Sequence, residues 1–501
     1  MPFLFITSIR SFLCKIRGSK TVHPCRTALR KTGGEIEART LFFLLILTTV
    51  TCLGGFIVAS ASFTLSLAIS ATLIIVIISY LSPEMALFFL IASMLLSPEF
   101  IVGDLLGRGA GDRGVTLRFD DFLLLIIGFS WFARTAVQKE LGLFRRTPLN
   151  RPIAYYIVIC VISTLIGFVM GRVDLKTGAL FVLKYFEYFI VYFMTVNFLT
   201  SKEQIRRFVI AILLVCTIVC VIAIAQIPAG GRVTAPFEGA MGEPNTLGGY
   251  LVLILSITLG LLLTSDALKW KTWLGTLVVL ITISLLATLS RSSWVVVGPM
   301  LLTLIYFSRR KLILVVPLII VIALAPFVTP KVIKDRALFT FTQEKQRYQL
   351  EFGDVRIDTS TSARIVSWKK VLTQDFIRHP IFGHGVTGYR FLDAQYPRIL
   401  VETGLLGFII FLWLLASTFR NAVYTYRTTT DPLFSGLSLG YLAGFIAMLV
   451  HGIGANTFII VRIMEPFWFL TAIIIMIPSI EADERETPGL MRNGSGTGVT
   501  V

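Results

Sequence analysis

Stretches of apolar residues alternate with short polar connections along most of the chain. There are fourteen such stretches, and most of them approach the ~20 apolar residues that an α-helix needs to cross a bilayer. Their approximate bounds are 41–60, 62–81, 85–97, 121–138, 152–171, 179–199, 205–227, 246–265, 270–289, 293–308, 311–328, 399–418, 433–453 and 457–477. The 85–97 stretch is short and lies between Pro83 and Pro98, so a re-entrant segment is the alternative there. The pattern predicts an all-α polytopic membrane protein with about 12–14 transmembrane helices.

One long polar segment, residues 329–398, interrupts this alternation and holds twelve Lys and Arg against seven Asp and Glu. Within it, Ile365, Trp368, Leu372 and Phe376 fall on one helical face. This stripe predicts a short amphipathic helix lying on the membrane, with packing on the bundle as the alternative. We expect five regions: a basic cytoplasmic arm (1–40), a transmembrane bundle (41–328), an extracytoplasmic loop (329–398), C-terminal transmembrane helices (399–477) and a disordered cytoplasmic tail (478–501).

Composition and charge support the membrane assignment. The chain has 501 residues, of which 55% are hydrophobic and only 15% are charged, and its net charge is +17. Most basic residues lie in short connections on the side of the N-terminal arm, as the positive-inside rule requires. The charge therefore specifies topology, and nucleic acid is not an expected partner. Both termini are predicted to be cytoplasmic.

Arginines also occur in five connections on the opposite face, where topology does not require them. These connections are 98–120, 172–178, 228–245, 290–292 and 329–398. At a membrane surface a guanidinium that does not snorkel to headgroups needs an anionic partner. Arg232 and Arg291 are therefore candidates for binding a diphosphate, for which the arginine fork is well suited. For Arg291, snorkelling to headgroup phosphates is the alternative.

Other polar residues lie inside or beside apolar stretches. Asn245 either caps the helix that it begins or marks helix-start donors that face an anion. Lys184 with Glu187, and Arg462 with Glu465, are spaced three residues apart, so each pair is expected to neutralise itself on one helix face, with Arg462 kept as a candidate for the outer face.

The end of the long segment combines glycines with chemically active side chains. His384 lies between Gly383 and Gly385, a spacing that permits either tight turns or close approach to a ligand. Arg364 is one turn from Trp368 and is a candidate ligand-binding residue, although an amphipathic helix also explains this pair.

Asp393 and Tyr396 follow, just before the next apolar stretch. Glu402 lies one turn inside that stretch and is expected to bond an arginine or to order a loop. Gly404 and Gly407 are expected to give this helix one smooth face. His451 lies at the mouth of a later stretch, on the same side as the long segment.

The order of these features resembles the O-antigen ligase and Wzy-type polysaccharide polymerase superfamily, from about Asp121 to Ile477. The residues that carry the resemblance are Leu183 to Phe189, Pro244-Asn245, Ser290-Arg291-Ser292, Arg364, Trp368, His379-Pro380, Gly383-His384-Gly385, Gly388, Tyr396, Leu400, Glu402, Gly404 and Gly407.

The resemblance implies glycosyl transfer from an undecaprenyl-diphosphate-linked glycan in the bacterial inner membrane, on the extracytoplasmic face and without metal or cofactor. Arg291 and Arg232 would neutralise the departing diphosphate, and Asp393 would orient or deprotonate the acceptor hydroxyl. The substrate-binding candidates are Arg364, Trp368, His384, Tyr396, Glu402 and Asn245. The implied partners are the bilayer, a flippase and a chain-length regulator.

The chain departs from the ligase pattern at one position. Ligases place a His-Asn pair about nine residues before the glutamate, whereas this chain has Asp393-Ala394. This favours a polymerase of repeat units, with a ligase acting on lipid A or protein as the alternative. A transporter of similar substrates would be expected to show repeated halves, which the sequence lacks. A scaffold protein would not need arginines on five outer connections.

Overall fold

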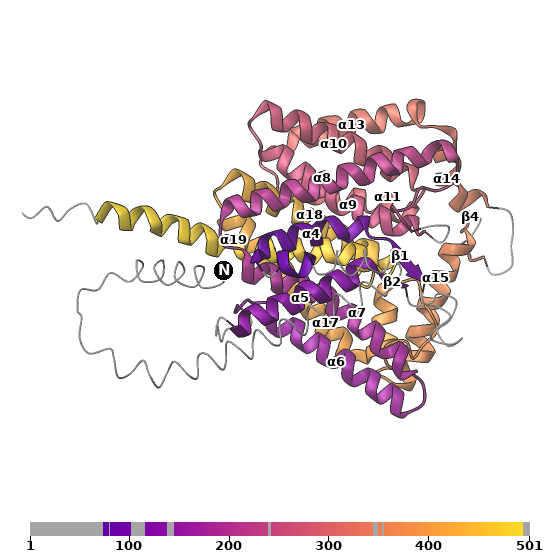
Figure 1. Cartoon of the computed structure of the whole chain (residues 1–501). Coiled ribbons are helices and arrows are strands. Elements are labelled where there is room, and N and C mark those ends of the chain that lie inside the picture. The colour runs from indigo at the N-terminus through magenta and orange to yellow at the C-terminus, as the bar shows by residue number, and fades with distance from the viewer. Residues whose placement is uncertain are drawn as a thin grey trace, which may run out of the picture. The chain divides into compact units, whose positions relative to one another are not determined.

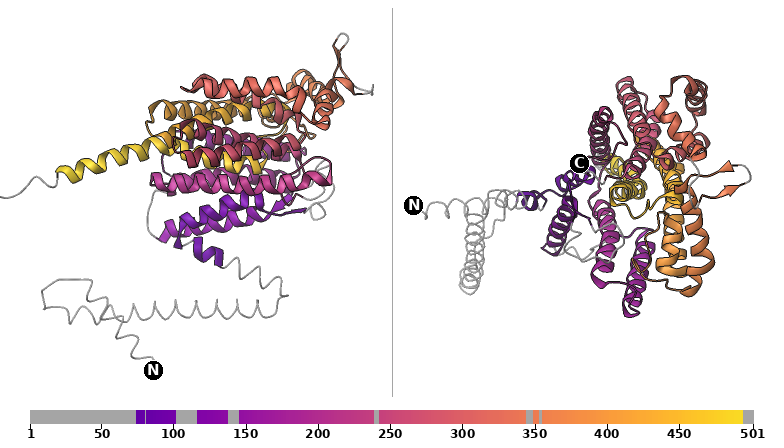
Figure 2. Two further views of the ribbon diagram at one scale, coloured as in Figure 1. Left: turned by 90° about the horizontal axis from the view of Figure 1, so that it is seen from above. Right: turned by 90° about the vertical axis from the view of Figure 1, so that its right-hand side faces the viewer.

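The computed structural model describes residues 74–79, 81–101, 116–137, 145–238, 242–343, 349–352 and 355–493. The chain separates into two units, Met1–Ile74 and Ile75–Val501. The second unit is a helix bundle whose long helices run roughly side by side (Figures 1 and 2). Eight of the described helices are long and apolar enough to cross a membrane. The predicted all-α polytopic membrane fold is thereby confirmed.

The membrane-length helices are α6 (Asn150–Val169), α7 (Leu175–Phe198), α8 (Lys202–Gln226), α9 (Pro244–Thr264), α10 (Leu268–Ala287), α17 (Gln395–Thr428), α18 (Pro432–Gly454) and α19 (Val461–Asn493). The other helices are α4 (Pro83–Leu96), α5 (Phe119–Val137), α11 (Arg291–Val295), α12 (Val297–Phe307), α13 (Lys311–Val328), α14 (Lys331–Thr342), α15 (Thr359–Lys370) and α16 (Phe376–Arg378). Two short antiparallel hairpins pair β1 (Glu99–Ile101) with β2 (Thr116–Arg118), and β3 (Glu351–Phe352) with β4 (Val355–Arg356).

Among the described residues, eight helices reach membrane length, against about 12–14 predicted for the whole chain. The 41–60 span and most of the 62–81 span lie outside the described residues. Helix α4 is not re-entrant, because its two ends contact opposite ends of the bundle. Glu84 pairs with Arg207 at the start of α8, while the Ser97 hydroxyl donates to Asp120 at the start of α5 (2.9 Å).

The connections between helices gather at two ends of the bundle. The loop end carries the described parts of 329–394, and there Arg291 bonds Asp358 and the Asn456 amide donates to the Leu392 carbonyl. The basic end carries the turns 199–201, 265–267, 308–310 and 429–431, where Lys202 pairs with Asp431.

The described parts of the five arginine-containing connections lie at the loop end, where Figure 1 labels β1, β2, α11, α14 and α15. Arg462 bonds the carbonyls of Ser97 and Pro236, which joins two of these connections. The Val233 amide donates to the Ala287 carbonyl at the 290–292 connection (3.2 Å), and the 172–178 connection packs against Gly385.

Helices α9 and α18 cross at van der Waals contact because small residues line their interface. Gly436, Gly440 and Gly444 repeat every four residues on α18 and face Ser256 and Gly260 of α9. A Cβ added to Gly440 would lie 2.6 Å from the Ser256 carbonyl oxygen. In lipid, where hydrophobic burial does not drive helices together, such close backbone packing is a main source of association.

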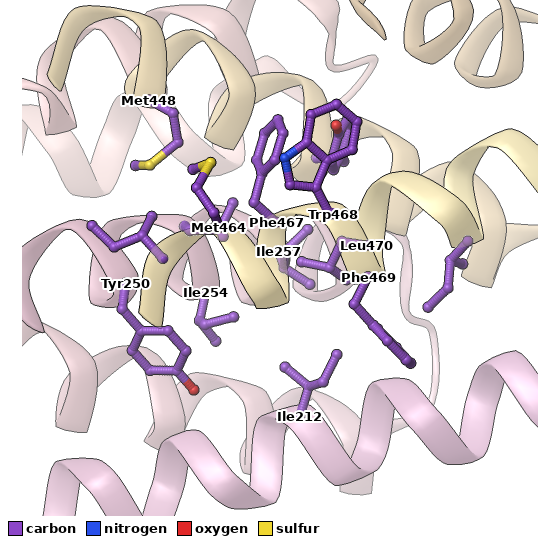
Figure 3. Packing of buried hydrophobic residues seen from close by; sticks show 14 of the residues in the cluster. Ile212, Tyr250, Ile254, Ile257, Met448, Met464, Phe467, Trp468, Phe469 and Leu470 are labelled. Carbon is purple, nitrogen blue, oxygen red and sulfur yellow. The ribbon is translucent and has the colours of Figure 1, made fainter. Parts of the chain in front are cut away.

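Large side chains fill the space around this crossing. Figure 3 shows Tyr250, Ile254 and Ile257 of α9 meeting Met464 and the run Phe467 to Leu470 of α19. The Trp468 ring lies 4.8 Å from Phe189 of α7, in an edge arrangement. Helix α19 continues to Asn493, so the predicted boundary at residue 477 falls inside a helix.

The end of the long segment docks into a break in α17. Gly404 has φ 70° and ψ −172°, a conformation that essentially only glycine adopts, and it interrupts the helical hydrogen bonds. Four backbone hydrogen bonds replace them: His384 N to Val401 O (2.9 Å), Gly385 N to Glu402 O (2.9 Å), Leu405 N to Pro380 O (2.8 Å) and Leu406 N to Ile381 O (3.4 Å). The expectation that Gly404 smooths one helix face is therefore wrong, because its role is to break the helix.

The predicted amphipathic stretch 363–378 is helical but is divided by a π-helical turn at Val371–Asp375. Two residues of its apolar stripe, Ile365 and Leu372, are exposed. Ile365 and Leu372 are thus available to a membrane surface, whereas Phe376 packs against the buried cluster of Val371, Leu392 and Val401.

We predict that Gly404→Ala lowers the thermal unfolding midpoint of the purified protein. A Cβ there would lie 2.2 Å from the Ile381 carbonyl oxygen, and the backbone strain alone costs about 1–3 kcal/mol. The matched control is Gly275→Ala in α10, whose added Cβ meets nothing within 4 Å. Equal midpoints for the two variants would contradict the proposed role of the break.

Candidate functional site

A cluster of three arginines surrounds the junction between α10 and α11. The chain leaves the helical path at Thr288 and Leu289, which exposes two carbonyls that a continuous helix would bond. Arg232 Nε donates to the Thr288 carbonyl (3.2 Å), and Arg336 Nε donates to the Leu289 carbonyl (3.3 Å). Arg291 is the first residue of α11. We call Arg232, Arg291 and Arg336 the arginine cluster.

One carboxylate is bonded to this cluster. Arg291 donates to Asp358 at 2.7 Å, and the Asp358 side chain is 1% exposed. The Phe339 ring lies between two guanidinium groups, 5.8 Å from Arg291 and 5.5 Å from Arg336. Burial would raise the pKa of Asp358, but hydrogen bonds from Arg291 and Thr361 hold it below its ordinary value. Asp358 is therefore a carboxylate at neutral pH.

Among the described residues, the three arginines of the cluster form an ion pair with one carboxylate, Asp358. Burial, followed by repulsion from Arg336 and Arg291, lowers the pKa of Arg232. Burial and repulsion from Arg291 lower the pKa of Arg336, and Asp358 opposes this only in part. Because the three guanidinium groups repel one another, an anion bound among them would be stabilised by all three.

A second polar group lies on α15 and at the start of α17. Arg364 donates to Asp393 at 2.8 Å, and the Asp393 side chain is 43% exposed. The Trp368 and Tyr396 rings lie 6.4 Å apart, and the Tyr396 hydroxyl donates to the Leu449 carbonyl (2.6 Å). Four predicted site residues thus fall into two neighbouring pairs.

A buried chain of hydrogen bonds runs behind these groups. The Ser290 hydroxyl donates to Asn245 Oδ1 (2.7 Å) and bonds the Ser293 hydroxyl (2.8 Å). Ser293 in turn bonds His451 Nε2 (3.2 Å), and His451 Nδ1 bonds the Thr457 hydroxyl (2.7 Å). We call these five residues the polar relay. Asn245 does not cap α9, because Glu243 occupies the cap position and its side chain makes no capping bond.

Two glycines of α9 make room for the polar relay. A Cβ on Gly248 would lie 2.2 Å from the Ser293 hydroxyl, and one on Gly249 would lie 3.2 Å from the His451 ring. The relay also joins the two charged groups. Ser293 shares the short helix α11 with Arg291, while His451 shares α18 with Leu449, whose carbonyl accepts from Tyr396.

His384 does not reach the arginine cluster. Its Nδ1 lies 3.1 Å from the Val401 carbonyl, and its ring lies 4.7 Å from His379 and 5.5 Å from Tyr389. Burial lowers the pKa of His384, which leaves the ring neutral at pH 7. The geometry assigns His384 to the loop that docks in the α17 break.

Glu402 pairs within its own helix and orders a loop, as the sequence led us to expect. It accepts from Arg398 Nε (3.1 Å) and from the Thr387 amide (3.3 Å), and both charged side chains are buried. This pair lies apart from the arginine cluster, at the α17 break.

The two predicted intrahelical charge pairs have different outcomes. Lys184 lies 3.6 Å from Glu187, as expected, and also bonds Asp121. The pairing of Arg462 with Glu465 is wrong. Arg462 instead bonds backbone carbonyls and lies 3.7 Å from Glu238, because its side chain reaches the loop end.

Sequence reasoning missed two residues of the site. Arg336 is one of the twelve basic residues of the long segment, and no local sequence pattern distinguishes it from the others. Asp358 did leave a signal, because an aspartate before a Thr/Ser-rich helix start is a capping pattern, and its side chain accepts from the Thr361 amide.

The fold and the site together define a multi-pass membrane protein with a cationic site at one end of its helix bundle. Residues 276–412 match the family described as O-Antigen ligase, Wzy_C. The match supports the predicted resemblance to the O-antigen ligase and Wzy-type superfamily over this segment. The matched segment contains Arg291, Arg336, Asp358, Arg364 and Asp393. No curated protein matches the chain at a significant level.

We predict that Ser293→Ala destabilises the protein by about 1–3 kcal/mol, because it leaves a buried nitrogen of His451 without its hydrogen bond. Thermal or denaturant unfolding of the purified protein measures the change. Ser292→Ala is the matched control, since Ser292 is half-buried and lies 3.4 Å from its Asn245 acceptor. If Ser292→Ala lost as much stability as Ser293→Ala, the proposed contribution of the polar relay to stability would be contradicted.

Proposed function

We propose that the protein is a glycosyltransferase that polymerises oligosaccharide repeat units carried on undecaprenyl diphosphate. The reaction would take place at the loop end, on the extracytoplasmic face of a bacterial inner membrane. The observation that carries this proposal is the arginine cluster. Three guanidinium groups converge on one helix junction at the end of a membrane bundle, and the O-antigen ligase match spans that junction.

The chemistry of the donor explains why such a cluster is useful. When a sugar leaves a lipid diphosphate, negative charge grows on the departing phosphate oxygen. Donors fixed before the reaction stabilise this charge without reorganising, and removing one such donor typically costs ~10²–10³ in rate. Backbone carbonyls hold Arg232 and Arg336 in place, so these side chains are oriented before a substrate arrives.

The pair of Arg364 and Asp393 supplies the groups that an acceptor needs. Asp393 is partly exposed and bonds Arg364, which fixes its orientation. In the proposed reaction Asp393 orients or deprotonates the attacking hydroxyl. Arg364, Trp368 and Tyr396 position the saccharide, because aromatic rings and a guanidinium offer stacking surfaces and hydrogen-bond donors.

Two observations bear on whether the protein is a polymerase or a ligase. Asp393-Ala394 stands where the ligase pattern has His-Asn, which favours polymerisation. The matching family is described as O-antigen ligase, which favours transfer of finished glycan to lipid A or protein. We give polymerisation precedence because the position where the ligase pattern has histidine carries Asp393, whose carboxylate accepts from Arg364.

The test is deletion of the gene followed by analysis of the glycans that accumulate. The wild-type gene and its variants are then reintroduced on a plasmid into the deletion strain. Polymerase loss leaves single lipid-linked repeats on the outer leaflet. Finished but unattached polymer would instead show a ligase, and repeats trapped on the inner leaflet would show a flippase.

In this assay Arg291→Ala is expected to abolish chain growth while the protein remains in the membrane. Arg291→Lys should restore little activity, because lysine keeps the positive charge but lacks the planar guanidinium that donates two parallel hydrogen bonds. Arg207→Gln is the control, since Arg207 pairs with Glu84 at the basic end. Polymer of normal length in Arg291→Ala cells would refute the role of the cluster.

A further inference from the structure

A cavity of about 390 Å³ lies at the basic end, opposite the arginine cluster. Its walls come from the first half of α8, the turn between α9 and α10, and the start of α18. Small-molecule and cofactor sites typically measure about 300–1,000 Å³. The proposed glycosyl transfer does not use this cavity.

The lining of the cavity changes from charged to apolar along α8. Lys202 and Arg206 lie on the first turns of the helix, and Val209 and Leu213 lie on the turns that follow. Leu274 of α10 continues the apolar wall. The mouth also holds Asp431 and Asp266, which pair with Lys202 and with Arg310. Arg206 therefore supplies the positive charge of the mouth above an apolar interior, an arrangement that suits an anionic amphiphile.

The two cations of the mouth are not equivalent. Lys202 bonds Asp431, which also caps α18 by accepting from two backbone amides. Arg206 is exposed and lies over the Trp270 ring at 5.5 Å. Among the described residues, no carboxylate forms an ion pair with Arg206. Its charge is therefore available to a ligand, and the ring limits the positions that the guanidinium adopts.

We propose that this cavity binds an anionic glycerophospholipid, with the phosphate at Arg206 and Lys202 and one acyl chain along the apolar wall. Basic pockets between transmembrane helices are suited to anionic headgroups. The apolar wall of Val209, Leu213 and Leu274 argues against a free phosphate, which would gain nothing from it. Residues 1–40 of the chain are a poor occupant, because they carry eight Lys and Arg.

The test measures lipid binding to the purified full chain in a neutral detergent by native mass spectrometry. The probes are phosphatidylglycerol, phosphatidylcholine and inorganic phosphate. We expect phosphatidylglycerol to bind more tightly than phosphatidylcholine, and inorganic phosphate not to displace it. Arg206→Gln should weaken phosphatidylglycerol binding about fivefold, the effect of one basic residue at a membrane surface.

Two further variants separate the site from general electrostatics. Arg207→Gln removes the same charge one residue away, but that side chain bonds Glu84 instead, so binding should not change. Ile210→Trp fills the cavity without altering charge and should abolish binding. Equal loss in Arg206→Gln and Arg207→Gln, equal binding of both lipids, or displacement by inorganic phosphate would each overturn the proposal.

Discussion

The site depends on one constraint, which is that like-charged guanidinium groups must be held close together at the end of a membrane bundle. The interruption between α10 and α11 meets this constraint, because it frees two carbonyls that Arg232 and Arg336 bond. Asp358 pairs with Arg291, which neutralises one of the three charges, and the same carboxylate caps the N-terminus of α15. The remaining positive charge is the basis of the proposed diphosphate site.

A second interruption positions the other half of the site. The break at Gly404 allows residues 380–385 to complete the backbone hydrogen bonds of α17. This anchors the long segment to the bundle just before Asp393 and Tyr396. The polar relay then connects the two halves through α11 and α18, with His451 bonded at both ring nitrogens. Two helix interruptions and one buried relay thus arrange polar groups that lipid would not solvate.

Much of the fold was predictable, because lipid requires long apolar stretches and topology requires basic connections on one side. The same reasoning identified Arg291, Arg232 and Arg364 as charges that topology does not explain. The partners of these arginines were not predictable. Arg336 and Asp358 are brought to the α10–α11 junction by a tertiary path that no local pattern encodes. Gly404 illustrates a different limit, since glycine in a helix can smooth a face or break it, and only the docked loop distinguishes the two.

The most direct test of the central claim is the binding of a polyprenyl diphosphate to the purified full chain. Affinity would be compared between the wild type, the double variant Arg232→Gln/Arg336→Gln and the control Arg207→Gln. Loss of two charge-assisted hydrogen-bond donors is expected to weaken binding by at least about tenfold, with the control unchanged. Equal affinity in all three proteins would contradict a diphosphate site at the arginine cluster.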